Sequence, residues 1–151
     1  MKGLSRVALL PFGLALVLFA GTLWNKFVFD DVHQVLNNPW IRDFQHLPEI
    51  FSSHAWAFAG KESNYYRPLM HLTNAALYVI FGPVPWVFHL LNVLLHGAVT
   101  TAFFVLVFRI LRKSDTGTRE MHGRAALLAA FVFVMIESMT WNVSSTHPVS
   151  T

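Results

Sequence analysis

The sequence predicts an all-α, polytopic membrane protein with three transmembrane helices and interfacial helices in a long first outer loop. Of its 151 residues, 54% are hydrophobic and only 13% are charged, whereas a soluble domain usually has about 25% charged residues. Long stretches without charge recur along the chain, and basic residues gather between them. The chain has no Cys, which excludes disulfides and thiolate sites. We therefore expect the chain to lie in a lipid bilayer and to bind no nucleic acid.

The first predicted transmembrane helix is Val7–Trp24, which follows a short basic segment at 1–6. This stretch carries no charge, and a spanning helix needs about 20 apolar residues. Pro11 falls near its start, where a proline costs least. A cleaved signal peptide is the rival interpretation, but Ala20-Gly21-Thr22 is a poor small-residue cleavage site.

The next charge-free stretch, Pro68–Phe108, has 41 residues and is too long for one crossing. Two prolines and a glycine interrupt it after Phe81, where a helix cannot continue. The first part, Pro68–Phe81, would reach about 21 Å, short of a hydrocarbon core about 30 Å thick. We therefore predict an interfacial or re-entrant helix there, and the second transmembrane helix at Trp86–Phe108.

The direction of the spans follows from the basic residues. Segment 109–124 holds five Lys or Arg against two acidic residues, and such a short basic loop is typically cytoplasmic. The amino terminus is basic too, so two crossings lie between these segments. A third transmembrane helix at 125–141 then returns outward. Loop 25–67 and tail 142–151 therefore share the extracytoplasmic face, where we expect short amphipathic helices lying against the membrane.

Two adjacent carboxylates, Asp30 and Asp31, stand six residues beyond the first span. Because like charges repel, one of them retains its proton unless a cation or basic group neutralises the pair. Such a pair suits a general base or a divalent-metal site at the membrane surface. The alternatives are a solvated acidic pair, or an aspartate that caps a helix beginning at Val32.

Arg67 lies where the outer loop re-enters the membrane interface. A guanidinium there suits bidentate binding of a phosphate. The alternative is an interface anchor whose charged end reaches water while its stem stays apolar.

Further polar residues lie at membrane depth or near it. His89, Asn92 and His96 are spaced for one face of the second span, where they suit either function or interhelical hydrogen bonding. Glu137 is the carboxylate of the third span, and pairing with a span histidine is as plausible for it as a catalytic role. His147, followed by Pro148, lies in the tail and is within possible reach of the same outer site.

Several short segments occur in an order that resembles a known family. They are Phe27-Val28-Phe29-Asp30-Asp31, Asn37-Asn38-Pro39, Tyr66-Arg67-Pro68-Leu69, Phe81-Gly82 with Pro85, residues 88–96, and His147-Pro148-Val149. This order is similar to the amino-terminal part of the C-superfamily membrane glycosyltransferases. It is most similar to the transmembrane and tetratricopeptide-repeat O-mannosyltransferase-like proteins and their bacterial counterparts.

The resemblance implies transfer of a sugar from a polyprenyl-phosphate donor to an acceptor protein or glycan on the outer or lumenal face. It assigns Asp30 and Asp31 to catalysis, and Arg67 then suits the donor phosphate. The membrane would be the plasma membrane in a bacterium and the endoplasmic reticulum in a eukaryote. Family members are much longer, so we expect a fragment of such an enzyme, inactive alone. A non-catalytic scaffold and a transporter fragment are the alternative functions.

Overall fold

The computed structural model describes the backbone of residues 2–113 and 117–145, and the side chains of 7–113 and 117–135 apart from Arg119. All regular elements in these ranges are helical. They form two compact units. The first contains Met1–Gly21 and Leu91–Thr151, and the second contains Thr22–Leu90.

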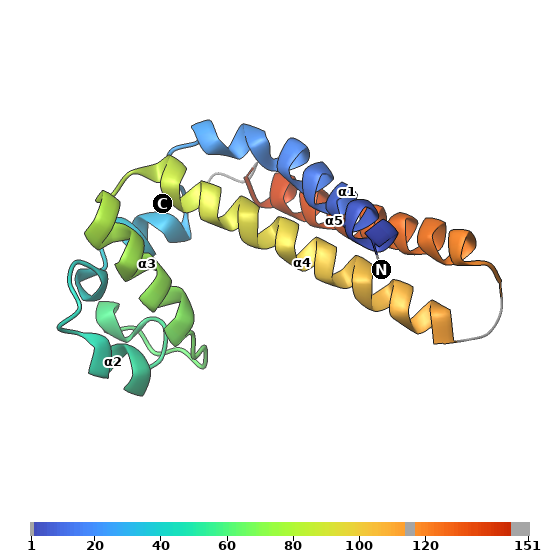
Figure 1. The fold of residues 1–151 in the computed structure, drawn as a ribbon. Helices are drawn as coiled ribbons and strands as arrows, with labels where there is room; N and C mark the ends of the chain where they lie inside the picture. Colours follow the sequence, from blue (N-terminus) through green and yellow to red (C-terminus); the bar gives the residue numbers. More distant parts are fainter. Residues whose placement is uncertain (1, 114–116, 146–151) are drawn as a thin grey trace. The chain divides into compact units, whose positions relative to one another are not determined.

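The first unit is built from long helices: α1 (Lys2–Phe19), the later part of α4 (Pro85–Lys113) and α5 (Arg119–Ser145). Figure 1 shows α1 in blue beside α5 in red, and the two helices contact each other. Phe104 and Phe108 of α4 are buried against the small residues Ala126 and Ala130 of α5. Small residues let helices approach closely within a membrane, so this core suits a bundle surrounded by lipid.

Two segments are long and apolar enough to cross a membrane, judged by length and composition: Val7–Trp24 and α4. Only 11% and 22% of their most apolar windows are buried, and side chains such as Val17 (76% exposed) and Leu10 (60%) face outward. Helices that are apolar on their exposed surface are typical of a membrane protein and not of a soluble core. The first of these segments coincides with the first predicted span, and its crossing stays a prediction.

Two further predictions about the spans concern the place of Pro11 and the third crossing. Pro11 does not lie near a helix start, because α1 begins at Lys2 and places the proline inside the helix. The third predicted span, 125–141, lies within α5. That helix does not meet the same criterion in the part of the chain that the structure describes, so the third crossing stays a prediction.

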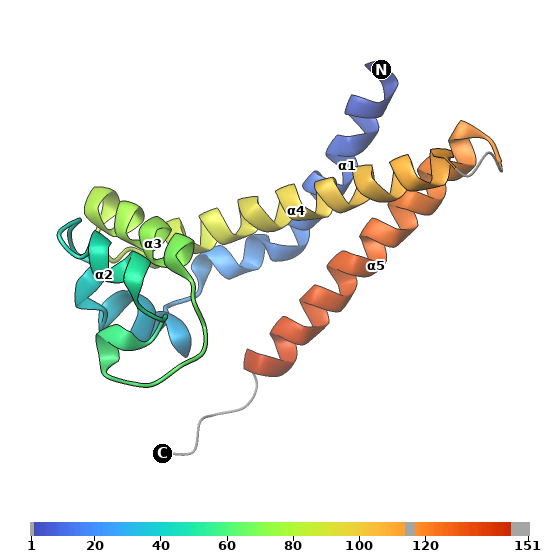
Figure 2. The same cartoon turned by 90° about the horizontal axis from the view of Figure 1, so that it is seen from below.

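The second unit gathers short helices around α3 (Pro68–Phe81), as Figures 1 and 2 show in green and teal. In chain order they are the π-helix η2 (Val32–Leu36), the 3-10 helix η3 (Pro39–Ile41), α2 (Leu47–Ser52) and the 3-10 helix η4 (Ala57–Ala59). A further 3-10 turn, η1 (Ala20–Trp24), continues α1. The helices η2, η3 and α2 each contact α3.

Helix α3 has the bounds that the prolines and glycine predict. Pro68 occupies its first turn, where the missing N–H costs nothing. At the other end Gly82 has φ 73°, and its N–H donates to the Tyr78 carbonyl at 2.8 Å. Glycine adopts this positive φ without strain, so the helix can end here. Whether α3 lies in the interface stays a prediction.

The core of the second unit joins the loop to α3 and the start of α4. Val35, Ile41, Ala75, Val87 and Phe88 are buried together. Most of their surface is removed from water, and burial of apolar area is the dominant favourable term in folding. Loop 25–67 therefore packs on α3, and whether its short helices lie against a membrane stays a prediction.

Candidate functional site

The acidic pair follows a strained turn. Phe29 has φ 47°, the one positive value among the described residues other than glycine. Asp31 N–H donates to the Val28 carbonyl at 3.0 Å, and Val32 N–H donates to the Phe29 carbonyl at 3.2 Å. A bulky side chain in the left-handed region costs free energy. Such outliers persist where the surrounding structure enforces them, and they cluster at functional sites.

The two aspartates differ in their surroundings. Asp30 is exposed, whereas Asp31 is half-buried. Burial raises the pKa of Asp31 above its usual value of 3.8, while attraction by His89 and a hydrogen bond from the Val28 backbone partly oppose that rise. The nearby Asp30 charge raises the Asp31 pKa slightly further. The structure thus separates a solvated carboxylate from one whose ionised form is disfavoured.

Asp31 does not act as a helix cap through its side chain. It occupies the N-cap position of η2, which begins at Val32 as that alternative predicts, but its carboxylate makes no capping hydrogen bond. An N-cap aspartate would normally accept from a backbone N–H of the first turn. The carboxylate is therefore not committed to stabilising this helix.

His89 is the side chain whose charge interacts most strongly with Asp31. Its ring is 5% exposed and lies 6.3 Å from the Phe27 ring, which meets Phe88 edge-on at 5.4 Å. Its buried Nε2 has no hydrogen-bond partner among the residues that the structure describes. A buried polar atom without a partner is costly and uncommon, so it marks a place where a ligand or proton would complete the bonding.

Arg67 stands at the start of α3 with its side chain exposed. Its guanidinium lies 4.9 Å from the centre of the Tyr65 ring. Within the described ranges, no ion pair joins it to Asp30 or Asp31. The amino end of a helix carries partial positive charge, so the cation and the helix end have the same sign and together favour an anion.

The remaining predicted polar residues belong to the first unit or lie outside the described side chains. Asn92 is exposed on α4. His96 is half-buried in the first unit, with its ring 4.6 Å from Phe19 and 6.0 Å from Phe133. Glu137 lies on the α5 backbone, but its side chain is outside the described set, and His147 lies outside the described residues altogether.

One buried polar pair was not predicted from the sequence. Asn38 and His71 are 0% and 2% exposed. Asn38 Nδ2 donates to His71 Nδ1 at 3.2 Å, and His71 Nε2 donates to the Ala55 carbonyl at 3.1 Å. Asn38 Oδ1 in turn accepts from Trp40 N–H at 2.9 Å and caps η3. The Asn38-Pro39 dipeptide did signal a helix start, but not the long-range bond.

This pair holds His71 neutral. One ring nitrogen must accept and the other must donate to make the two observed bonds, which only the neutral ring satisfies. Burial lowers the pKa of His71 below its usual 6.5, and its bond to Ala55 opposes that shift in part. His71 is thus a structural residue that fixes the loop on α3, one turn beyond Arg67.

The segment before Arg67 is also anchored. Tyr66 Oη donates to the Phe51 carbonyl at 2.7 Å, and Ala55 N–H donates to the Tyr65 carbonyl at 2.7 Å. These bonds tie residues 65 and 66 to the loop. The position of Arg67 is therefore set by contacts on both sides of it.

No group of three or more His, Asp or Glu side chains suited to one metal ion occurs in the described part of the chain. Asp30 and Asp31 supply two carboxylates, one of them exposed. A divalent ion usually takes six or more oxygen ligands, so these residues do not by themselves assemble a metal site.

The chain is similar in sequence to several known protein O-mannosyl-transferases. It is 30% identical over 145 residues to human protein O-mannosyl-transferase TMTC4, which covers 91% of this chain and 18% of that protein. It is 38% identical over 105 residues to Tmtc2 of Drosophila melanogaster (67% and 11%), and 30% identical over 123 residues to mouse TMTC3 (77% and 12%). No family model and no solved structure matches. The chain spans less than a fifth of the length of these relatives. By sequence it is a homologue of the TMTC protein O-mannosyl-transferases, related to one part of these longer membrane glycosyltransferases.

Proposed function

We propose that this chain is part of a membrane glycosyltransferase that moves a sugar from a polyprenyl-phosphate donor to an acceptor on the extracytoplasmic face. The relatives are named protein O-mannosyl-transferases, which supports mannose as the sugar and a protein hydroxyl as the acceptor. The observation that carries the proposal is the setting of Asp31. Its carboxylate is half-buried beside His89, its pKa is raised by burial, and it follows the strained Phe29.

Asp31 is the proposed general base. In the reaction the acceptor oxygen forms a bond to the anomeric carbon of the sugar, and the bond from that carbon to the donor phosphate breaks. The acceptor proton passes to Asp31, and the electron pair of the broken bond leaves with the phosphate. A base works best when its pKa approaches the working pH, so the raised pKa of Asp31 suits this role better than the exposed Asp30 does.

His89 is the proposed positioning partner of Asp31. Its attraction lowers the pKa of Asp31 and so opposes the effect of burial. When the base takes up a proton, that attraction is lost, and the unpartnered Nε2 of the buried ring provides a further site for a hydrogen bond.

Arg67 is the proposed partner of the donor phosphate. The leaving phosphate gains negative charge as its bond to the sugar breaks, and a fixed cation stabilises that charge. The guanidinium stands over Tyr65 at the amino end of α3, where the helix dipole adds to the attraction. Its planar fork favours bidentate binding of phosphate oxygens.

The proposal is tested in a full-length enzyme that carries this segment, with a polyprenyl-phosphate sugar and an acceptor peptide. Arg67→Lys keeps the charge but loses the fork, so we expect a higher KM for the donor with a smaller change in kcat. Arg42→Lys is the matched control, because Arg42 is an exposed arginine of the same unit whose side chain donates to the Leu36 carbonyl. Transfer from a nucleotide sugar but from no polyprenyl-phosphate sugar would contradict the proposal.

A further inference from the structure

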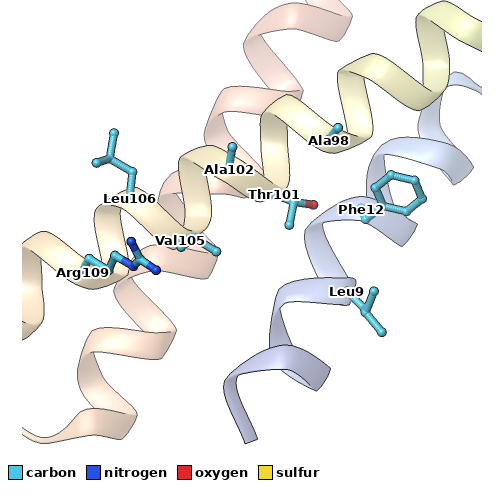
Figure 3. A pocket seen from close by; sticks show the side chains of 8 residues that line it. All are labelled: Leu9, Phe12, Ala98, Thr101, Ala102, Val105, Leu106 and Arg109. Atoms are coloured by element: carbon cyan, nitrogen blue, oxygen red, sulfur yellow. The ribbon is translucent and has the colours of Figure 1, made fainter. Parts of the chain in front are cut away.

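An apolar groove runs along the first unit between α1 and α4. It is an open groove with a volume of about 540 Å³, and Figure 3 shows its lining side chains on the two helices. Seven of the eight lining residues are apolar or present a methyl group, and the eighth is a cation. They are Leu9, Phe12, Ala98, Thr101, Ala102, Val105, Leu106 and Arg109.

The polar atom of Thr101 is already satisfied. Its hydroxyl donates to the Gly97 carbonyl at 2.8 Å, which leaves the methyl group free to line the groove. Apart from Arg109, the lining side chains therefore offer no free hydrogen-bond donor to a polar occupant. A hydrocarbon chain suits such a surface, because it needs no hydrogen-bond partner.

The two ends of the groove differ. At one end α1 and α4 approach closely, since a Cβ placed on Gly97 would lie 2.9 Å from Phe12 Cδ2. At the other end stands the exposed Arg109, whose guanidinium is turned back along α4 toward Val105 in Figure 3. An occupant would thus place its apolar part inward and an anionic group at Arg109.

The length of the groove matches one leaflet of a bilayer. Arg109 comes eleven positions after Ala98 on α4, which corresponds to about 16 Å at 1.5 Å per residue. This is about half of a hydrocarbon core about 30 Å thick. A partner helix would cross both leaflets, whereas a groove of half that length with a cation at headgroup level fits a single acyl chain.

We propose that this groove binds one acyl chain of an anionic phospholipid, with Arg109 on its headgroup phosphate. The site lies in the first unit, so the inference does not depend on the glycosyltransferase proposal. With the predicted topology, the lipid comes from the cytoplasmic leaflet, where anionic lipids and juxtamembrane basic residues attract one another. The bound lipid would then fill the space between α1 and α4.

The experiment uses native mass spectrometry of the 151-residue chain in detergent, with phosphatidylglycerol and phosphatidylcholine of identical acyl chains at equal concentration. We expect about fivefold more phosphatidylglycerol adduct, the size expected for one cation near an anionic headgroup. Arg109→Gln should remove this preference. Arg112→Gln is the matched control, because Arg112 is equally exposed on α4 but does not line the groove, and it should retain the preference.

Two further variants separate the possible occupants. Ala102→Phe fills the groove, so it should reduce the adducts of both lipids while the thermal melting of the chain stays unchanged. Ala102→Cys introduces the one thiol of the chain and should form no disulfide-linked dimer in vesicles. An equal loss of preference in the two arginine variants would show diffuse attraction and overturn the proposal. A dimer linked through the thiol at position 102 would show that a second copy covers the groove, and it would also overturn the proposal.

Discussion

Asn38 and His71, which lie 33 residues apart in the sequence, share a buried hydrogen bond of 3.2 Å that joins loop 25–67 to α3. The same asparagine caps η3, and the same histidine donates to the Ala55 carbonyl. Three separate segments are therefore held by two side chains. Arg67 lies one turn before His71 on α3, so this pair also sets where the proposed phosphate-binding residue stands.

Replacing Asn38 with Ala should destabilise the second unit by about 1–3 kcal/mol, because the buried Nδ1 of His71 loses its donor. The expected result is a lower midpoint in urea, followed by the fluorescence of Trp40 and Trp56. Asn37→Ala is the control, since Asn37 is exposed beside it and should leave the stability within about 0.5 kcal/mol of the native value. Equal midpoints for the two variants would show that Asn38 does not stabilise the second unit.

Replacing Asn38 with Asp should reverse the pH dependence of stability. In the native chain the His71 pKa is lowered, so its contribution is present above pH 6.5 and is lost as the pH falls. The introduced carboxylate keeps an oxygen for Trp40 N–H but presents a second acceptor to His71, which must then be protonated. The pKa of His71 would be raised, and the variant should melt higher at about pH 5.5 than at about pH 8. A higher melting point at the alkaline pH in both proteins would contradict the assigned bond.

The strain at Phe29 should be measurable. Its φ of 47° costs about 1–2 kcal/mol for a residue with a side chain and little for glycine. Phe29→Gly should therefore be more stable than Phe29→Ala by about 1 kcal/mol, although both remove the same ring. Comparing the two small residues by urea unfolding cancels the loss of the ring, which is 44% exposed. If alanine were the more stable of the two, the turn before Asp30 would not be strained.

The extents of the helices were the most predictable part of the fold. Helix α3 has the expected bounds, Pro68–Phe81, because a charge-free run, the flanking proline and Gly82 act locally. The start of α1 was not predictable in this way, since the basic segment 1–6 continues the helix across Pro11.

The site could be predicted only as a set of residue types. The sequence singled out Asp30 and Asp31 together, and the difference between them depends on the burial of Asp31 and on its interaction with His89, which is distant in the sequence. Spacing grouped His89 with His96, yet His96 packs between Phe19 and Phe133 in the other unit. His71 gave no signal, because its partner lies far away in the chain.

The predicted topology can be tested by single-cysteine labelling, since the chain has no Cys of its own. With the outer loop extracytoplasmic and the basic loop cytoplasmic, Cys introduced in place of Glu62 should react with an impermeant reagent from outside, and Cys in place of Ser114 should not. Permeabilised membranes provide the control in which both positions react. Labelling of position 114 in intact cells would show that the orientation is the opposite of the predicted one.

Asp31→Asn should separate activity from stability. Because burial raises the pKa of Asp31, the ionised side chain destabilises the folded state. The contribution of this carboxyl to stability is therefore fully present below pH 3.8 and is lost as the pH rises through the raised pKa. The neutral amide avoids that cost, so the variant should melt no lower than the native protein at about pH 7.5. A structural carboxylate would show the opposite change.

The most direct test of the account is the kcat of sugar transfer by Asp31→Asn and Asp30→Asn variants of a full-length enzyme that carries this segment. A lost general base typically lowers the rate by about 10²–10⁴-fold, so we expect that loss in Asp31→Asn, with a melting point no lower than that of the native protein. The exposed Asp30 should tolerate the same change with a loss of less than about tenfold, well below the range for a general base. Native turnover in Asp31→Asn and in the double variant would contradict the account and leave the loop as a non-catalytic scaffold.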